Sequence, residues 1–169
     1  MTVIQGKRTK LPFQLAICGV AELPEVVARF KPTHVISITD PGDDLPEFSI
    51  DVTVLRLAFW DAHTLTKVTK MLAAREPDDY PNLDHARAIL DFGELLPKGA
   101  RVLTHCWAGV SRSTAAAFVL AVQRKSGDEK SAFDLVKVLR PGAMPNRLIV
   151  QFADKLLGAD GRMKACLGR

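Results

Sequence analysis

Residues 101–124 read RVLTHCWAGVSRSTAAAFVLAVQR and combine a short apolar strand, a loop with a central glycine and an apolar helix. The strand is expected over residues 101–104, and residues 115–122 are almost wholly apolar, as a buried helix requires. A glycine loop between a strand and the start of a helix lets several backbone N–H groups converge on one anion. The sequence therefore predicts that residues 106–112 wrap around an anion the size of a phosphoryl group.

Outside this stretch, strands alternate with helices along the chain. Strands are expected at residues 13–20, 34–38 and 52–59, which are short apolar or β-branched runs bounded by turn residues. Helices are expected at residues 21–30, 65–74, 82–96, 129–139 and 146–157, where apolar side chains recur at helical spacing and Asn82 serves as an N-cap. This order predicts an α/β fold with a central, mainly parallel sheet of about four or five strands, flanked by helices.

The length of 169 residues fits a single domain, and no repeat or Gly/Ser-rich linker divides the chain. We expect one domain over residues 1–169, with flexible ends at residues 1–10 and 158–169. An apolar fraction of 47% and a charged fraction of 25% exclude disordered, collagen-like and coiled-coil chains. Polar residues or Pro interrupt every apolar run before the roughly 18 residues that a membrane helix needs, so no membrane span is predicted.

The 23 basic and 19 acidic side chains leave a net charge of +4, which favours anionic partners only weakly, and no nucleic-acid partner is predicted. The three cysteines are an odd number at wide spacing, which argues against a disulfide framework and for a reducing, cytoplasmic compartment. Cys18 and Cys166 are expected to be chemically silent thiols. No two His or Cys residues have the tight spacing of zinc ligands, so neither a metal nor another cofactor is expected.

Cys106 opens the loop, and five residues separate it from Arg112. The helix N-terminus and the guanidinium both favour a thiolate, so the pKa of Cys106 is expected to fall and its sulfur to become a nucleophile. Arg112 offers a planar fork that binds two oxygens of a phosphate group and follows them into the transition state. Ser113, or as the second choice Ser111, is expected to hydrogen-bond to the sulfur and help it leave.

The other loop residues are expected to act through their backbone or to support the loop. Phosphate oxygens would be held by the backbone N–H groups of Trp107, Ala108, Gly109, Val110, Ser111 and Arg112. The Trp107 ring is expected to pack against the sheet, the alternative being that it shapes the floor of the pocket. His105 precedes Cys106 on the strand, so its side chain should point away and order the loop rather than act as a base. Asn146 is expected to be a helix N-cap and a brace for the loop.

Two motifs carry a resemblance to a known family. Residues 105–113 resemble the signature loop of the cysteine-dependent protein tyrosine and dual-specificity phosphatases. Downstream, Arg140-Pro141-Gly142-Ala143-Met144-Pro145-Asn146 resembles the Arg-Pro…Pro-Asn element that follows this loop by roughly thirty residues in dual-specificity members. The similarity runs from about residue 33 to residue 157 and is greatest to compact bacterial members without large insertions. It implies a central sheet flanked by helices, a covalent phosphocysteine intermediate and catalysis without a metal.

Such enzymes also need an acid that protonates the leaving oxygen, and family members carry an Asp upstream of the signature loop. We expect Asp61 in this role, because residues 57–61 resemble the family's exit from strand to loop. Asp78 and Asp79 are the alternatives, and an Asp61 without this role would serve as an N-cap. His63, close to Asp61, is either a surface residue or part of the site.

The resemblance implies a phosphomonoester hydrolase, in first place a protein-tyrosine or dual-specificity phosphatase, whose partners are phosphorylated proteins or small phosphomonoesters. The alternatives are a phospho-binding module without turnover, a phosphatase for a non-protein ester such as an inositol phosphate, and a sulfurtransferase or arsenate reductase. The signature loop lacks lysines, which speaks against a phosphoinositide, and no resolving cysteine lies near Cys106, which speaks against an arsenate reductase. Neither the physiological substrate nor an oligomeric state is predicted.

Overall fold

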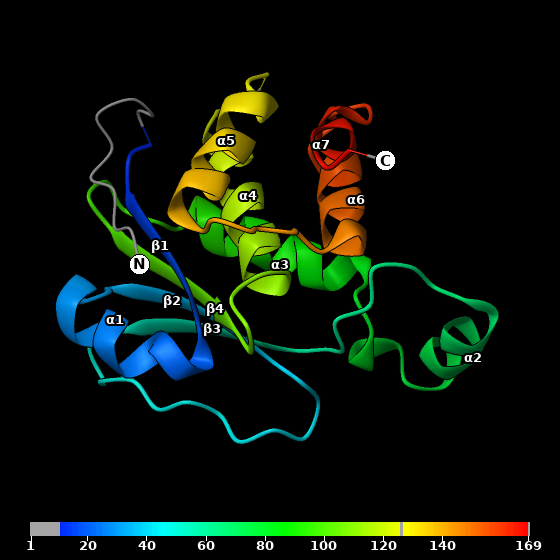
Figure 1. Cartoon of the computed structure of the whole chain (residues 1–169), viewed down its shortest axis with the longest axis horizontal. Helices are drawn as coiled ribbons and strands as arrows, with labels where there is room; N and C mark the ends of the chain where they lie inside the picture. The colour runs from blue at the N-terminus through cyan, green and yellow to red at the C-terminus, as the bar shows by residue number, and fades with distance from the viewer. Residues whose placement is uncertain (1–10, 126, 169) are drawn as a thin grey trace.

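The computed structural model describes residues 11–125 and 127–168, and in this part of the chain it contains a four-stranded parallel sheet (Figure 1). The strands are β1 (Gln14–Gly19), β2 (His34–Thr39), β3 (Thr53–Ala58) and β4 (Arg101–Cys106), in the spatial order β1-β4-β2-β3. β4 therefore lies between β1 and β2, and every neighbouring pair is parallel. The prediction of a mainly parallel α/β sheet is confirmed.

Helices cover both faces of the sheet (Figure 1). A 3-10 turn, η1 (Val20–Glu22), leads into α1 (Leu23–Phe30), whose apolar side chains form one core cluster with residues of β1, β2 and β4. The larger cluster lies on the other face, with contributions from α3 (Leu83–Glu94), α4 (Arg112–Arg124), α5 (Glu129–Leu139) and α6 (Arg147–Leu156). α2 (Lys67–Arg75) and the 3-10 turn η2 (Pro77–Asp79) stand beside the sheet, at the right in Figure 1. Within the described residues, no helix has both the length and the apolar character that a membrane crossing requires.

The sequence explains which elements are central. Every residue of β4 after Arg101 is buried, and α4 is buried from Arg112 to Val122. A strand covered on both faces and a helix enclosed by other elements need mostly apolar sequence. Val102 and Leu103 supply it in β4 and residues 115–122 supply it in α4, while Thr104 and His105 are buried polar residues. β3 is an edge strand, and none of its residues is fully buried. The loop between β4 and α4 is thus held at both ends by buried elements.

Two details differ from the expected boundaries. β4 continues past Thr104 to Cys106, because β1 goes on pairing with it: Cys18 lies opposite His105, and Gly19 lies opposite Cys106. The part of the C-terminal end that is described, residues 158–168, was expected to be flexible, but it contains α7 (Arg162–Cys166) with a fully buried Met163. Residues 1–10 and 169, also expected to be flexible, lie outside the described residues.

Candidate active site

A cavity of about 650 Å³ opens at the edge of the sheet where the parallel strands end. Ligands of open parallel sheets bind at this edge, because the loops that follow the strands meet there. The loop from β4 to α4 forms one wall, and the segments after β2 and β3 form the others. The cavity is lined by Asp40, Asp43, Trp60, Asp61, His63, Cys106, Trp107, Ala108, Val110, Ser111, Arg112 and Met144.

Cys106 is the last residue of β4 and is only 2% exposed. Its Sγ lies 3.2 Å from the Oγ of Ser113, which is fully buried in the first turn of α4. The hydroxyl near the sulfur is thus that of Ser113, whereas Ser111 faces another group. A hydroxyl at this distance can donate to a thiolate and stabilise its charge.

Four of the loop carbonyls accept hydrogen bonds from outside the loop. Trp107 O accepts from Val20 N (2.9 Å), Ala108 O from the Arg140 side chain (2.9 Å), and Val110 O from Met144 N (2.9 Å). Ser111 O accepts from Asn146 N (3.2 Å). Within the described part of the chain, no backbone N–H of residues 107–112 donates to a protein group. These four carbonyls therefore point away from the cavity, and the N–H groups have no protein partner among the described residues, which leaves them available to an anion.

Two glycines allow this loop to close against the end of β1. Gly109 has φ of +70°, and a Cβ atom there would lie 2.4 Å from the backbone N of Gly19. A Cβ on Gly19 would in turn lie 2.9 Å from the carbonyl oxygen of Trp107. Both approaches are shorter than a side chain permits, so this contact between loop and strand depends on glycine at both positions.

Arg112 is 3% exposed, and its guanidinium is fixed along one edge. Nη1 donates to Asp40 Oδ1 at 2.5 Å and to the carbonyl oxygen of Phe59 at 2.7 Å. Nε has no hydrogen-bond partner among the described residues. One edge of the fork is thus held by the ends of β2 and β3, and the Nε edge remains able to donate to a ligand in the cavity.

Asp40 was not singled out from the sequence as a site residue, because the Asp40-Pro41-Gly42-Asp43 segment has the composition of a turn. The position of Asp40 in the sequence nevertheless indicates that it could lie at the site. It comes two residues after the strand predicted at residues 34–38, and the carboxyl ends of parallel strands meet at one edge, where Arg112 also begins its helix.

Asp61 lies at the mouth of the cavity with its carboxylate against the loop. Oδ1 accepts from Ser111 Oγ at 2.6 Å and from Asn146 Nδ2 at 2.9 Å. The Nε2 atom of His63 lies 3.0 Å from Ser111 Oγ and 3.7 Å from Asp61 Oδ1. Of the three aspartates considered for the acid, the structure brings Asp61 to the cavity, while Asp78 and Asp79 lie in η2 and are not among its lining residues.

The downstream Arg140-to-Asn146 segment braces the loop from two sides. Asn146 is fully buried; its Oδ1 accepts from Ile149 N at 3.1 Å as the N-cap of α6, and its Nδ2 also donates to Ala62 O at 3.0 Å. Arg140 donates to both carboxylate oxygens of Glu22, at 2.8 and 2.7 Å, and this contact holds the pKa of Glu22 below its ordinary value. Glu22 was not identified from the sequence, since its partner lies on a distant helix end.

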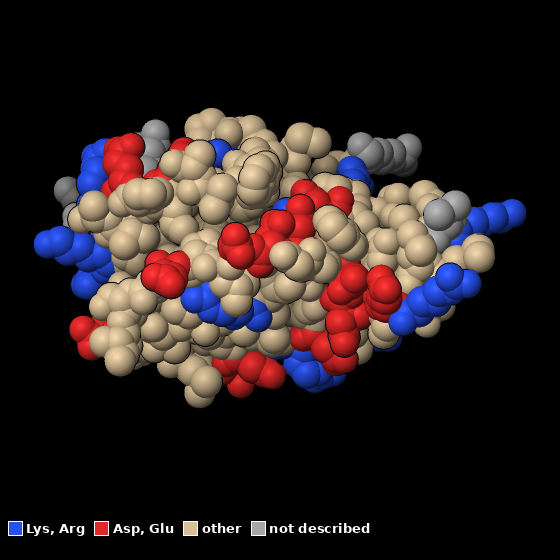
Figure 2. Space-filling view, turned by 90° about the horizontal axis from the view of Figure 1, so that it is seen from below, with Lys and Arg blue, Asp and Glu red and all other residues tan. Residues whose placement is uncertain are grey.

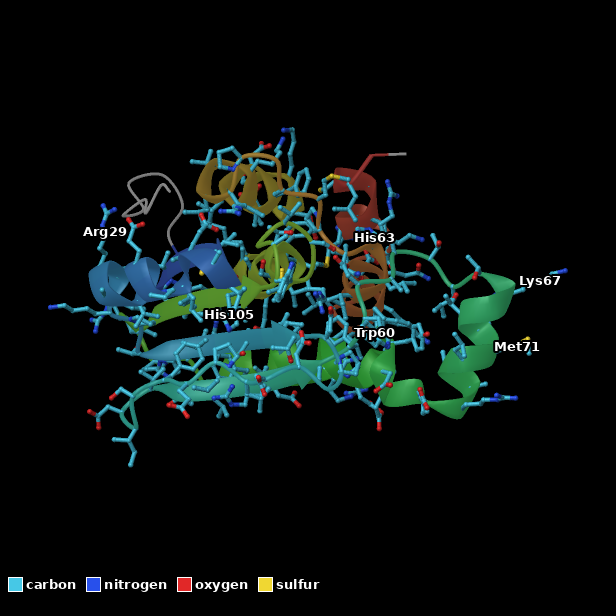
Figure 3. All side chains as sticks on the ribbon, turned by 60° about the horizontal axis from the view of Figure 1, so that its bottom comes forward. Arg29, Trp60, His63, Lys67, Met71 and His105 are labelled. Atoms are coloured by element: carbon cyan, nitrogen blue, oxygen red, sulfur yellow. The ribbon has the colours of Figure 1, made fainter. Side chains whose placement is uncertain are left out.

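His105 and Trp107, the neighbours of Cys106, have opposite environments. The His105 ring is fully buried, lies 5.9 Å from the Phe48 ring and has no hydrogen-bond partner at either nitrogen among the described residues. Burial, with a smaller contribution from Arg56, lowers the pKa of His105 to about 4, so the ring is neutral at pH 7. Figure 3 shows it within the sheet layer, apart from Trp60 and His63. Trp107 is 66% exposed and lines the cavity, so the expectation that its ring packs against the sheet is wrong.

Comparison with known proteins gives one curated relative and several structures of similar fold. No family model matches the chain. The dual specificity protein phosphatase MPK-4 of Drosophila melanogaster is 27% identical over 123 residues, which are 72% of this chain and 28% of the fly protein. The chain thus spans little more than a quarter of that relative.

Among solved structures, DUSP15 superposes with a TM-score of 0.62 at 20% identity, over 99% of this chain and 93% of that one. PTPMT1 in complex with PI(5)P gives a TM-score of 0.54 at 17% identity, over 86% of this chain and 91% of that one. At these identities the superpositions show that the fold is shared.

Proposed function

We propose that this chain, which belongs to the cysteine-dependent dual-specificity phosphatase family, hydrolyses phosphomonoesters through a phosphocysteine intermediate. The observation that carries the proposal is the loop around Cys106. Four of its carbonyls are bound from outside, its N–H groups are unpaired within the described residues, and the buried Nε of Arg112 has no hydrogen-bond partner among them. Such a loop receives the oxygens of a phosphoryl group and places its phosphorus against the sulfur.

In the first step, the Cys106 thiolate attacks phosphorus. The S–P bond forms while the P–O bond to the leaving group breaks, and Asp61 transfers its proton to the departing oxygen. The loop N–H groups and Arg112 stabilise the charge on the three equatorial oxygens. Asp40 and Phe59 O contribute by fixing the guanidinium, so that no reorganisation is needed when the charge develops.

In the second step, a water molecule attacks the phosphocysteine. Asp61, now a carboxylate, takes a proton from the water, the S–P bond breaks, and inorganic phosphate leaves. The Ser113 hydroxyl, 3.2 Å from the sulfur, donates to the thiolate that is released. The proton balance closes, because Asp61 regains in this step the proton that it gave in the first.

Aryl phosphates, and phosphotyrosine among them, are the substrates that the cavity favours. Trp60, Trp107 and Met144 line the cavity and are 42%, 66% and 66% exposed, so they offer apolar surface to an aromatic leaving group. A phosphoinositide, bound by the structurally similar PTPMT1, is a weaker candidate here. Among the described residues that line the cavity, Arg112 is the single Lys or Arg. The use of a thiolate nucleophile also favours a reducing compartment such as the cytoplasm.

The experiment that tests the proposal is turnover of p-nitrophenyl phosphate. Replacing Cys106 by Ser should reduce turnover to background with folding unchanged, because a serine hydroxyl is not ionised at neutral pH. Cys166→Ser is the matched control and should retain full activity, since Cys166 lies in α7, away from the cavity. Full activity in the Cys106→Ser variant would overturn the mechanism. Phosphate bound by the wild type without turnover would instead identify a binding module.

A further inference from the structure

The rim of the catalytic cavity is acidic, although the chain as a whole is basic. The segment between β2 and β3, residues 40–52, contains five acidic residues and no Lys or Arg. It lies at the bottom of Figure 1 and faces the viewer in Figure 2, where Asp and Glu side chains gather across the middle of the surface. The acidic residues of this segment are Asp40, Asp43, Asp44, Glu47 and Asp51.

Two of these carboxylates, those of Asp43 and Asp44, are unpaired at the cavity. Asp43 lines the main cavity and also an adjoining one of about 220 Å³, which Asp44 lines as well and which reaches Cys106. Both side chains are exposed, and within the described residues neither carboxylate forms a salt bridge. Asp40 differs, because its charge is balanced by Arg112.

The positive groups near the cavity do not offset these two charges. Arg112 is already paired with Asp40, and its Nε, which has no partner among the described residues, would be taken by the substrate phosphate. Arg56, the next cation along the chain, donates to Pro46 O at 2.9 Å, has its guanidinium 5.8 Å from the centre of the Phe48 ring and does not line either cavity. The site therefore combines a buried anion receptor at its floor with free negative charge at its rim.

A ligand complementary to this arrangement carries a phosphate group and, a short distance away, a positive charge. The buried, unpartnered Nε of Arg112 indicates that the ligand carries an anionic group, and the unpaired carboxylates of Asp43 and Asp44 indicate that it also carries a cationic group. Additional phosphates or carboxylates next to the reacting phosphate would be repelled by the rim. The repulsion should weaken binding of polyanionic substrates more than binding of a singly phosphorylated peptide.

We propose that the site selects phosphopeptides with Lys or Arg close to the phosphorylated residue, and that Asp43 and Asp44 determine this preference. The proposal rests on the phosphatase function proposed above. The expected preference is about 2- to 25-fold in kcat/KM, because each of the two exposed ion pairs contributes about 1.4- to 5-fold. It should reside mainly in KM, since the rim charges do not touch the reacting atoms.

The test compares two phosphotyrosine peptides that are identical except for Lys or Glu at the flanking positions. The wild type should prefer the Lys peptide, and the Asp43→Asn/Asp44→Asn variant should show a ratio near one. Neither carboxylate makes a hydrogen bond to a described residue, so this variant removes charge without removing a structural contact. A charge-matched variant at α3, Asp91→Asn/Glu94→Gln, should keep the wild-type ratio, because these exposed residues do not line the cavity.

The ratio of the two peptides separates specificity from damage, since a misfolded loop lowers both rates together. The inference would be overturned if the wild type hydrolysed the two peptides at equal rates or hydrolysed the Glu peptide faster. It would also be overturned if the Asp43/Asp44 variant kept the wild-type ratio, or if the wild type hydrolysed a phosphoinositide faster than the Lys peptide. Turnover of p-nitrophenyl phosphate by the wild type distinguishes the two failures. If only the peptide preference is wrong, this ester is still hydrolysed; if the proposed phosphatase function is wrong, it is not.

Discussion

His105 and Cys18 lie opposite each other on neighbouring strands, and burial keeps both side chains uncharged at neutral pH. Burial raises the pKa of the Cys18 thiol to about 12, and the nearby Glu22 carboxylate adds to the shift. Cys18 belongs to the core cluster on the α1 face, whereas Cys106 belongs to the cluster on the other face. The expectation that Cys18 is chemically silent agrees with these surroundings, because a protonated thiol is not a nucleophile.

The buried His105 predicts a specific pH dependence of stability. Its pKa is about 4 in the folded protein, against about 6.5 when unfolded, so between these values the unfolded chain binds more protons. Its contribution to the free energy of unfolding is therefore complete above pH 6.5 and is lost as the pH falls toward 4, by up to about 3 kcal/mol. Urea unfolding at pH 7 and pH 5 should show a larger loss for the wild type than for His105→Gln. Carboxylates titrate alike in both proteins, so parallel losses would contradict the prediction.

Among the loops, the β4–α4 loop depends most on one close backbone contact. Gly109→Ala should destabilise the protein by about 2 kcal/mol or more, because Ala is strained at positive φ and its Cβ also meets the end of β1. Gly142→Ala is the matched control: φ is +81° there, but no atom lies within 4 Å of the added Cβ, so the loss should be about 1 kcal/mol.

The same two variants, Gly109→Ala and Gly142→Ala, also show whether displacement of the β4–α4 loop, beyond backbone strain at a positive φ, lowers phosphatase activity. Gly109→Ala should also lower kcat/KM for p-nitrophenyl phosphate, since the loop N–H groups move with the backbone. Urea unfolding and steady-state kinetics on both variants measure the two effects. Equal losses of stability at the two positions would show that the contact with Gly19 contributes nothing.

The elements that the sequence predicted well are those with a local signal. The β4–loop–α4 unit carries an apolar strand, a glycine and an apolar helix within one continuous stretch, so its structure follows from neighbouring residues alone. Asn82 was predicted as an N-cap for a similar reason, and its Oδ1 accepts from the backbone N of Asp84 and of His85, each at 3.0 Å. The candidate nucleophile and arginine came from this local unit, with the family resemblance adding Asp61 and Asn146.

Contacts between distant segments had no such signal. Asp40 and Arg112 are 72 residues apart, and Glu22 and Arg140 are 118 residues apart, so neither pair can be recognised from spacing. α7 was missed for a related reason: its five residues are too few for a helical pattern. It is fixed by Asp154 in α6, whose Oδ2 accepts from Met163 N at 2.9 Å. These features depend on packing of complete elements, which sequence periodicity does not encode.

In the whole molecule, net charge and local charge make opposite predictions for the substrate. The net charge of +4 suggests attraction of anionic peptides, whereas the unpaired Asp43 and Asp44 suggest attraction of cationic ones. Screening of charges by dissolved salt decides which of the two effects dominates. The Debye length is about 8 Å at physiological ionic strength, so charges at the rim of the cavity act on a bound peptide while charges on distant helices do not.

Ionic strength therefore gives a test that needs no mutation. If the rim dominates, kcat/KM for the Lys-flanked phosphopeptide should fall as NaCl rises from about 20 mM to 500 mM, because an attraction is screened over this range. The value for the Glu-flanked peptide should rise over the same range, because a repulsion is screened. Opposite slopes cannot arise from a general effect of salt on the loop or on the thiolate, which would move both peptides in one direction. The reverse pair of slopes would mean that the net charge of the molecule, and not its acidic rim, controls the encounter with substrate.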